Sequence, residues 1–189
     1  LKQLEYVFNN DLSIKLCLSS KKQVDKSAGI VKRASADLAP VYGVNTGFGK
    51  LASKRIGYKD IQKLQHNLIL SHCSGVGTPI HENMVRFIIV LKLISLGRGA
   101  SGVRWDVCNL LEKMLEKRVS PVIPSQGSVG ASGDLAPLAH LAAVLIGEGE
   151  ATFEGELLSA KDALSSADLS PIKLGPKEGL ALINGTQFS

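Results

Sequence analysis

Apolar residues recur every three or four positions in several segments of the chain, which is the spacing of an amphipathic helix. The most regular stripe has members at i, i+3, i+7 and i+11, namely Ile61, Leu64, Leu68 and His72. Residues 81–96 are apolar nearly all round, which predicts a buried helix. The pattern as a whole predicts helices over 20–37, 60–74, 81–96, 105–118, 135–147, 159–164 and 178–188, the last one broken at Asn184-Gly185.

Glycine and proline separate these segments. Residues 41–49 contain three glycines, too many for a stable helix or a central strand, so a shaped loop is predicted there. Residues 119–133 hold two prolines and three glycines and are predicted to form a long loop. A small hairpin is expected over 151–157, and Asp60 and Asp134 are expected to cap the helices that follow them. The predicted fold class is therefore mainly α, with little strand.

Composition narrows the possible functions. The 189 residues are 44% hydrophobic and 21% charged, which is too apolar for a disordered chain. Aromatic residues make up 5%, so a base-stacking platform for nucleic acid is not expected. The net charge of +5 is spread along the chain, which indicates a solvated surface. The most apolar run, 87–96, is interrupted by Lys92 and is too short to span a bilayer, so no membrane partner is expected.

The cysteines bear on the cellular compartment of the protein, and the chain ends bear on whether the sequence is part of a longer one. Cys17, Cys73 and Cys108 lie far apart and form no C-x-x-C pair, so neither a disulfide framework nor a metal site is indicated. Thiols of this kind are typical of a reducing compartment, and a cytoplasmic protein is expected. The first residues do not resemble a signal peptide. The chain lacks an initiating methionine and stops shortly after a polar, glycine-bearing segment, so we expect it to be part of a longer protein.

The segment 126–134, with the sequence Q-G-S-V-G-A-S-G-D, is the most unusual in the chain. It lacks the lysine of a phosphate-binding loop, and its glycines are not spaced as in a dinucleotide-binding fingerprint. It is not the nucleophile elbow of a hydrolase, because the residue two positions after Ser132 is Asp134 rather than glycine. Two interpretations stay open: a flexible connecting loop, or a tripeptide, Ala131-Ser132-Gly133, that cyclises.

Each residue of this tripeptide suits a cyclisation. Gly133 has no side chain, so its nitrogen can come close to the carbonyl carbon of Ala131, which is itself small. The hydroxyl group of Ser132 can leave as water. Loss of two waters would give a methylidene-imidazolone group, an electrophile made from the chain itself. It would lie at the positive N-terminal end of the helix over 135–147, where developing negative charge is stabilised.

Three segments together resemble the aromatic amino acid ammonia-lyase family. They are A-S-G-D-L-A-P-L-A-H at 131–140, Y-G-V-N-T-G-F-G at 42–49 and L-I-N-G-T at 182–186. The first resembles the prosthetic-group motif of the family and the second its N-terminal active-site loop. The resemblance implies the N-terminal part of an ammonia-lyase-like fold, with a loop-rich helical domain over 1–100 and the start of a truncated central helix bundle over 101–189.

The resemblance also implies roles for individual residues. Ala131, Ser132 and Gly133 would form the electrophile, a methylidene-imidazolone, and no external cofactor would be needed. Tyr42 would be the catalytic base or a proton shuttle. From the residues alone, the alternative for this tyrosine is a loop aromatic packed against the preceding proline. Asn184 would hydrogen-bond the substrate or the prosthetic group.

Further site residues follow from the same resemblance. Gly49 would let the backbone come close to the substrate, while Asn45 would hold the loop in shape. His72 and Ser71 occupy a family position that helps to set the side-chain pocket, and Ser-His there resembles the histidine branch. Without the resemblance, His72 would be interpreted as a core histidine on an apolar stripe. His140 lies inside the following helix and is interpreted as structural.

The implied reaction is the non-oxidative deamination of L-histidine to trans-urocanate and ammonia. Two alternatives stay open: a tyrosine or phenylalanine lyase or aminomutase of the same family, and a non-catalytic helical interaction module that keeps the motifs. Members of the family are longer homotetramers whose active sites combine three subunits. The 189-residue chain alone is therefore expected to be inactive, to leave its tripeptide uncyclised and to self-associate through exposed apolar faces.

Overall fold

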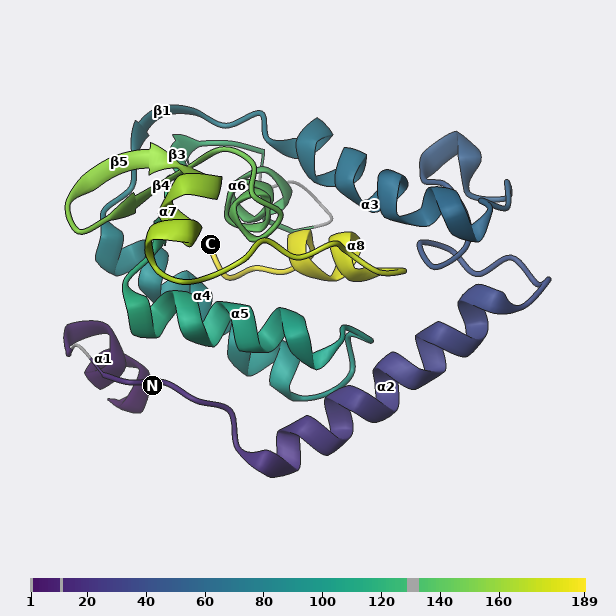
Figure 1. Cartoon of the computed structure of the whole chain (residues 1–189), viewed down its shortest axis with the longest axis horizontal. Helices are drawn as coiled ribbons and strands as arrows, with labels where there is room; N and C mark the ends of the chain where they lie inside the picture. The colour runs from purple at the N-terminus through teal and green to yellow at the C-terminus, as the bar shows by residue number, and fades with distance from the viewer. Residues whose placement is uncertain (1, 11, 129–132) are drawn as a thin grey trace.

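The structure is a computed structural model that describes residues 2–10, 12–128 and 133–189. Helices dominate the fold, which confirms the predicted class (Figure 1). They are α1 (Lys2–Asn9), α2 (Leu18–Ala36), the 3₁₀ helix η1 (Gly49–Leu51), α3 (Tyr58–His72), α4 (Glu82–Gly97), α5 (Trp105–Lys117), α6 (Leu135–Leu145), α7 (Ala160–Ser166) and α8 (Glu178–Ile183). Within the described ranges, none of them is both long enough and apolar enough to cross a membrane.

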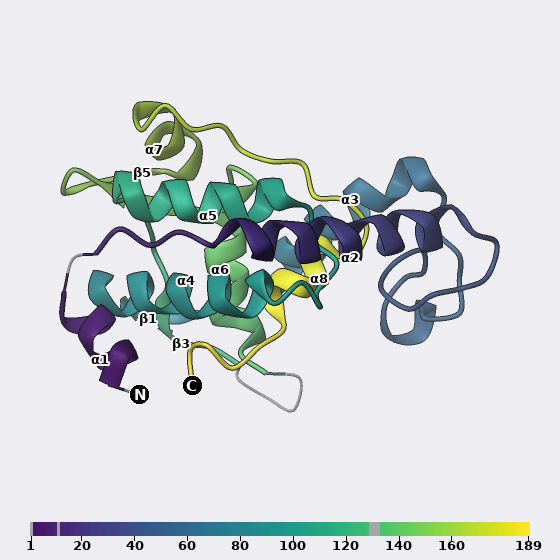
Figure 2. The same cartoon turned by 90° about the horizontal axis from the view of Figure 1, so that it is seen from below.

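Helix α6 lies at the centre of the molecule, with α3, α5, α7 and α8 packed around it (Figure 1). Its sequence is almost wholly apolar, and every residue from Ala136 to Leu145 except His140 is buried. Helix α4 packs against α5 and buries half of its residues, although its Met84 and Ile94 are 43% and 47% exposed. Helix α2 crosses the outside of α4 and α5 (Figure 2). Burying each large aliphatic side chain in this core contributes roughly 1.5–3 kcal/mol.

In the described part of the chain, two small antiparallel sheets flank the helices. The first pairs β1 (Val76–Pro79) with β3 (Pro124–Gln126). The second contains β2 (Ser120–Pro121), β4 (Glu150–Phe153) and β5 (Glu156–Ser159), in the order β2-β4-β5. The predicted hairpin is confirmed, because β4 and β5 are joined by Glu154 and Gly155 with φ of 52° and 83°, as in a type I′ turn.

The prediction of one long loop over 119–133 was wrong for residues 120–121 and 124–126. Strands β2 and β3 lie there, and each pairs with a strand from a distant part of the sequence. Both strands contain a proline, which lowers the local preference for a strand. Their stability comes from the distant partner, and a local sequence pattern does not record such a partner.

The start of α3 also differs from the prediction. The helix begins at Tyr58, after Gly57, and no side chain caps it. Asp60 is therefore not a cap; it lies in the first turn, where its charge complements the positive end of the helix. Helix α1 was not predicted at all. None of its residues is buried, so it contributes no apolar stripe to the core.

The end of α8 and the start of α6 are linked through Asp134. Helix α8 ends at Ile183, at the break predicted for Asn184-Gly185. The prediction that the helix continues to residue 188 was wrong, because no helix forms after the break. Asp134 precedes α6, but its side chain makes no capping hydrogen bond, so this part of the prediction was wrong. The carboxylate instead accepts hydrogen bonds from the backbone nitrogens of Phe188 and Ser189, at 2.6 and 2.9 Å. The carboxylate is therefore paired with this C-terminal segment rather than with the end of the helix.

Candidate functional site

A cavity of about 500 Å³ lies between the loop 41–49, α3, α8 and the first residue of α6. Tyr42, His72 and Asn184 line it, although they come from three separate parts of the sequence. The other lining residues are mostly apolar or small: Phe48, Leu68, Ala100, Ser101, Leu135, Lys177, Leu180, Ala181 and Ile183. The fold therefore places a phenol, an imidazole and an amide around one largely apolar cavity, an arrangement typical of sites for small molecules.

The loop 41–49 keeps its shape through the buried side chain of Asn45. The Asn45 amide nitrogen donates to the carbonyl oxygens of Ala39 and Ala34, at 2.9 and 3.2 Å. Its Oδ1 accepts a hydrogen bond from the Val41 backbone nitrogen at 2.7 Å. Asn45 thus holds the loop, as predicted, and satisfies backbone groups that form no regular structure.

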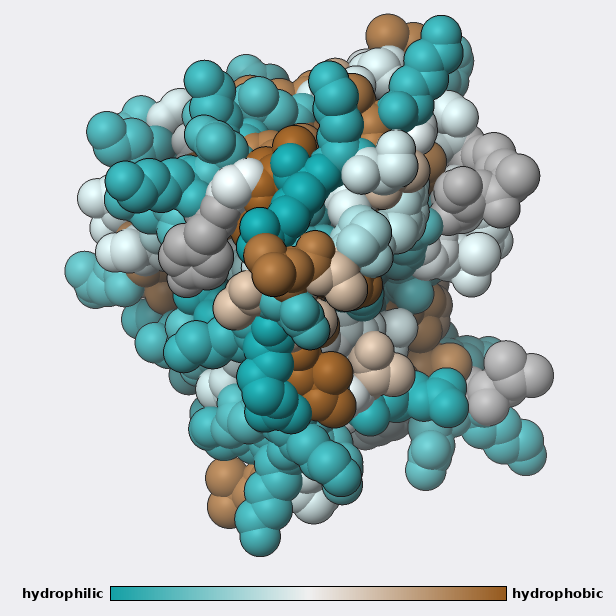
Figure 3. All heavy atoms as spheres, turned by 90° about the vertical axis from the view of Figure 1, so that its right-hand side faces the viewer, coloured by the Kyte–Doolittle hydropathy of each residue, from teal (hydrophilic) through white to brown (hydrophobic). Residues whose placement is uncertain are grey.

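Tyr42 projects from this loop and is 55% exposed. Its ring contacts the ring of Phe48 edge to face, with centroids 5.9 Å apart. The neighbouring Gly43 has φ +70°, and a Cβ there would lie 2.6 Å from a methyl carbon of Leu180. Glycine is needed at this position, since it lets the loop pack directly on α8 and holds the phenol at the cavity. Figure 3 shows this end of the molecule, where apolar groups lie among hydrophilic ones.

His72 is the last residue of α3 and has a defined hydrogen-bonding pattern. Its Nδ1 lies 2.8 Å from the Leu68 carbonyl oxygen and 3.1 Å from Ser71 Oγ. Because a carbonyl oxygen can only accept, Nδ1 carries the hydrogen, and Nε2 of the neutral ring is an acceptor. Ser71 is exposed and does not line the cavity; its hydroxyl donates to the same Leu68 carbonyl at 3.0 Å. Ser71 therefore contacts the histidine rather than the cavity.

Gly133 lies against Gly185, which is the residue that follows Asn184. The two glycines form a parallel bridge, and the Asp134 backbone nitrogen donates to the Gly185 carbonyl oxygen at 2.7 Å. Gly133 has φ +99°, and a Cβ there would lie 2.3 Å from that oxygen. Both the backbone angle and the space therefore require glycine at position 133.

Two lysines near the cavity were not recognised as site residues from the sequence. Lys92 of α4 is 1% exposed, and its Nζ donates to the Asn184 carbonyl oxygen at 2.7 Å. Burial lowers its pKa to about 7, against the opposing effect of Asp134. Lys177 lines the cavity and donates to the Ser101 carbonyl oxygen, and burial also lowers its pKa. The interruption of an apolar run by Lys92 was the available signal, whereas Lys177 gave none.

The remaining candidates fall into three groups. Gly49 is exposed at the start of η1 and is not among the residues that line the cavity. Ala131 and Ser132 lie outside the described residues. The contacts of His140 support the prediction that it is structural. Its Nε2 accepts a hydrogen bond from the Gly75 backbone nitrogen at 3.0 Å, and burial lowers its pKa.

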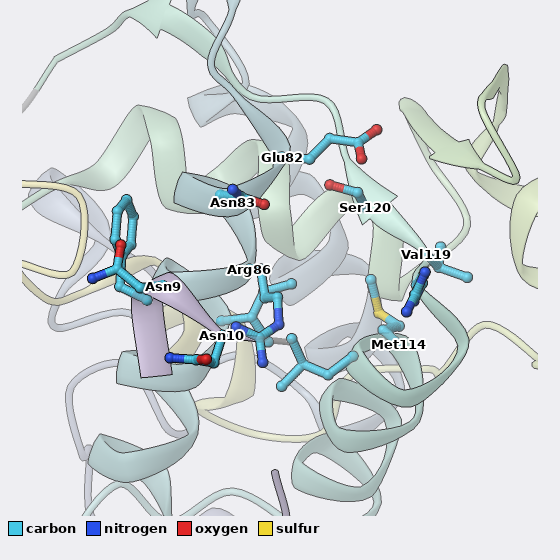
Figure 4. Close-up of a pocket in the computed structure, with 12 residues that line it drawn as sticks. Asn9, Asn10, Glu82, Asn83, Arg86, Met114, Val119 and Ser120 are labelled. Atoms are coloured by element: carbon cyan, nitrogen blue, oxygen red, sulfur yellow. The ribbon is translucent and has the colours of Figure 1, made fainter. Parts of the chain in front are cut away.

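A second cavity, of about 330 Å³, lies between α1, α4 and α5 (Figure 4). Arg86 points into it from α4 and donates to the carbonyl oxygens of Val7 and Leu12, at 2.9 and 2.8 Å. None of the candidate site residues lines this cavity. The hydrogen bonds of Arg86 attach the N-terminal segment to the core, so we interpret its role as structural.

Known proteins and solved structures resemble this chain over nearly its whole length. A family model described as aromatic amino acid lyase matches residues 1–189. A histidine ammonia-lyase from Roseobacter denitrificans is 58% identical over 189 residues, which cover 100% of this chain and 37% of that relative. The structure of histidine ammonia-lyase from Trypanosoma cruzi has a TM-score of 0.90 at 34% identity, covering 98% of this chain and 37% of that one. The structure of tyrosine aminomutase from Streptomyces globisporus has a TM-score of 0.91 at 34% identity, covering 99% of this chain and 35% of that one. The chain, which spans little more than a third of these relatives, belongs to the aromatic amino acid lyase family.

Proposed function

We propose that the protein carrying this sequence deaminates L-histidine to trans-urocanate and ammonia. The observation that carries the proposal is the single cavity of about 500 Å³ that unites Tyr42, His72 and Asn184. The 58% identity to a histidine ammonia-lyase over the whole chain favours histidine as the substrate. The Ser71-His72 pair points the same way.

The residues present fit a prosthetic group derived from Ala131-Ser132-Gly133. Gly133 is the member of the tripeptide that the structure describes, and the position a Cβ would need there is filled by the Gly185 carbonyl. A residue without a Cβ also lets its backbone nitrogen approach a neighbouring carbonyl carbon more closely than a residue with a side chain does. Such a group supplies an electrophile that makes the substrate amine a better leaving group.

The side chains around the cavity can perform the other tasks of the reaction. Tyr42 acts as the base that removes the β-proton of the substrate, because its half-exposed phenol borders the cavity. His72 accepts a hydrogen bond at Nε2 from the imidazole N–H of the substrate. Asn184 orients the substrate or the prosthetic group through its side-chain amide, and the apolar lining excludes water.

The proposal extends to the assembly and the compartment. The full-length protein forms a homotetramer in the cytoplasm and needs no external cofactor. The three thiols of this chain are free, which fits a reducing compartment. The 189-residue chain alone is inactive, because residues from other parts of the family fold complete the site. Urocanate formation by this chain alone would contradict that last statement.

The test is the turnover of L-histidine by the full-length protein, with Ser132→Ala alongside. We expect urocanate from the wild type and a loss of at least a thousandfold in kcat for the variant, because the electrophile cannot form. Equal turnover by both proteins would exclude the lyase mechanism. It would favour a non-catalytic helical interaction module instead.

A second candidate is a tyrosine or phenylalanine lyase or aminomutase. The high structural similarity to a tyrosine aminomutase favours it, since the N-terminal fold does not separate the two activities. A panel of L-histidine, L-tyrosine and L-phenylalanine decides between them. We expect His72→Leu to reduce kcat/KM for histidine at least tenfold and to spare the other amino acids, because only histidine uses the Nε2 acceptor.

A further inference from the structure

Lys92 is a charged residue within an otherwise apolar stretch of the core. Its side chain is 1% exposed, and the neighbouring residues of α4 that are buried with it are Ile88, Ile89, Leu93 and Leu96. Removing an ammonium group from water costs several kcal/mol even when it is paired. A methionine would fill a similar volume without that cost. Packing alone therefore does not account for a lysine at this position.

The Lys92 ammonium group contacts the segment that follows α8. Its Nζ donates to the carbonyl oxygen of Asn184 at 2.7 Å, a hydrogen bond between residues far apart in the sequence. The negative charge of Asp134 favours the charged form of the lysine, while burial opposes it. Asp134 itself already accepts hydrogen bonds from Phe188 and Ser189. Lys92 thus lies between the end of α8 and the start of α6.

The bond to Asn184 also determines the position of Gly185. The peptide group that contains the Asn184 carbonyl continues directly into Gly185, so holding that oxygen limits the movement of the glycine. The Gly185 carbonyl oxygen in turn accepts from the Asp134 nitrogen at 2.7 Å and occupies the space beside Gly133. Contacts therefore run from Lys92 through Asn184 and Gly185 to Gly133.

We propose that Lys92 is a positioning residue whose ammonium group holds the Asn184–Gly185 segment against Gly133, and that dehydration of the chain at Gly133 depends on this contact. The inference rests on the proposed function. In the dehydration a bond forms between the Gly133 nitrogen and the Ala131 carbonyl carbon. The carbonyl oxygen leaves as water with the amide hydrogens of Ser132 and Gly133. Ser132 then loses its Cα hydrogen and its hydroxyl group as a second water, so no oxidant is needed.

The experiment is the intact mass of the full-length protein as wild type, Lys92→Met and Lys113→Met. Lys113 is an exposed lysine of α5, so its variant removes the same charge away from the site. We expect the wild type and Lys113→Met to be two waters lighter than the encoded chain. In Lys92→Met the dehydrated fraction should fall at least tenfold, while circular dichroism and the thermal midpoint confirm folding.

Kinetics separate positioning from a general structural effect. If Lys92 acts through Gly133, kcat per total protein falls in proportion to the dehydrated fraction, and KM for L-histidine stays the same. Complete dehydration of folded Lys92→Met overturns the inference. If Lys92→Met does not fold, Lys92→Gln is measured in its place, because glutamine keeps a hydrogen-bond donor but carries no charge. Complete dehydration of folded Lys92→Gln then overturns the inference equally.

Failure of the proposed function gives a different result. A wild type with unmodified mass overturns both the self-derived group and the role of Lys92. A dehydrated wild type that turns over tyrosine or phenylalanine but not histidine overturns only the proposed substrate, and the masses of the Lys92 variants still decide the inference.

Discussion

At the scale of single residues, the site depends on buried polar side chains that bind backbone groups rather than each other. Asn45 holds the loop 41–49, Lys92 holds the carbonyl of Asn184, and Asp134 holds the last residues of the chain. Each of these side chains is at most 1% exposed. Because an unpaired buried polar group is costly, such contacts fix one backbone arrangement more sharply than apolar packing does.

Lys92 should make stability depend on pH. Its pKa is lowered from 10.5 to about 7 in the folded protein, so between these values the unfolded chain binds more protons and stability rises with pH. Lys92→Met lacks this contribution. Near pH 7 we expect Lys92→Met to have a larger free energy of unfolding than the wild type. The difference in free energy of unfolding between the two proteins should shrink by up to about 1.4 kcal/mol per pH unit towards pH 10.5.

Urea unfolding of both proteins across this pH window measures the effect. The sign is fixed by the lowered pKa, because a lysine that is charged in both states below pH 7 adds no slope there. A difference between the two proteins that stays constant from pH 7 to 10.5 would show that Lys92 is not buried as described.

The three cysteines should differ in reactivity. Cys17 is exposed, and hydrogen bonds from Ser19 and Ser20 lower its pKa to about 7. Burial raises the pKa of Cys73 to about 11 and that of Cys108 to about 12. Because the thiolate is the nucleophile, iodoacetamide should label Cys17 first, at a rate that rises up to pH 7 and then levels off. Peptide mass spectrometry follows the labelling, and equally fast labelling of Cys73 would contradict the prediction.

At the scale of elements, α8 depends on its neighbours. It has six residues, too few for an isolated helix to be stable. Buried Glu178 at its start accepts hydrogen bonds from the guanidinium group of Arg104, at 2.9 and 2.8 Å. Gln65 of α3 accepts from the Gly179 nitrogen at 2.9 Å, and Lys92 binds the Asn184 carbonyl. Polar contacts with three other segments thus place Asn184 at the cavity.

Loss of one of these contacts should loosen the site. Gln65→Leu leaves the buried Gly179 nitrogen without its acceptor, which should cost about 1–3 kcal/mol of stability. Thermal and urea unfolding measure the change. Gln62→Leu, at an exposed position of the same helix, is the matched control and should have an effect below about 0.5 kcal/mol. Equal stability of the two variants would exclude a role for Gln65 in holding α8.

The elements that could be predicted from the sequence are those with a strong local pattern. α2, α4, α5 and α6 follow from apolar spacing and glycine or proline boundaries, and the β4–β5 hairpin follows from its Glu154-Gly155 turn. Strands β2 and β3 could not be predicted, since their partners are distant in the sequence. The cap predicted at Asp134 was wrong for a related reason: its carboxylate binds the distant residues Phe188 and Ser189 instead.

At the scale of the whole molecule, three motifs that are separate in the sequence meet at one cavity. Tyr42, His72 and Asn184 could be proposed from their motifs, whereas their common location could only come from the fold. Lys92 could not be assigned, because a lone lysine in an apolar helix does not identify its distant partner. The motifs therefore suggested the proposed chemistry, and the packing shows which side chains hold the segments around the cavity.

The N-terminal segment is attached to the core without burying any residue of its helix. Helix α1 buries no residue and is held by contacts of Arg86 and by the edge-to-face pair of Phe8 and Phe87. We expect trypsin to cleave early after Lys15, which is exposed in an extended stretch, and Arg86→Ala to accelerate this cleavage severalfold. Arg98→Ala is the control, and cleavage first within α5 would contradict the prediction.

The contact between Gly133 and Gly185 sets an order of events during synthesis. The two residues are far apart in sequence, so Gly133 leaves the ribosome before its partner exists. At about 5–20 residues per second, the intervening chain takes on the order of 3–10 s to make. Until then the Gly185 carbonyl cannot lie beside Gly133. The contacts of Lys92 with Asn184 and of Asp134 with Phe188 and Ser189 cannot form either. The chemistry proposed for this position therefore cannot begin during translation of its own motif, but only after α8 has been made and has packed against the core.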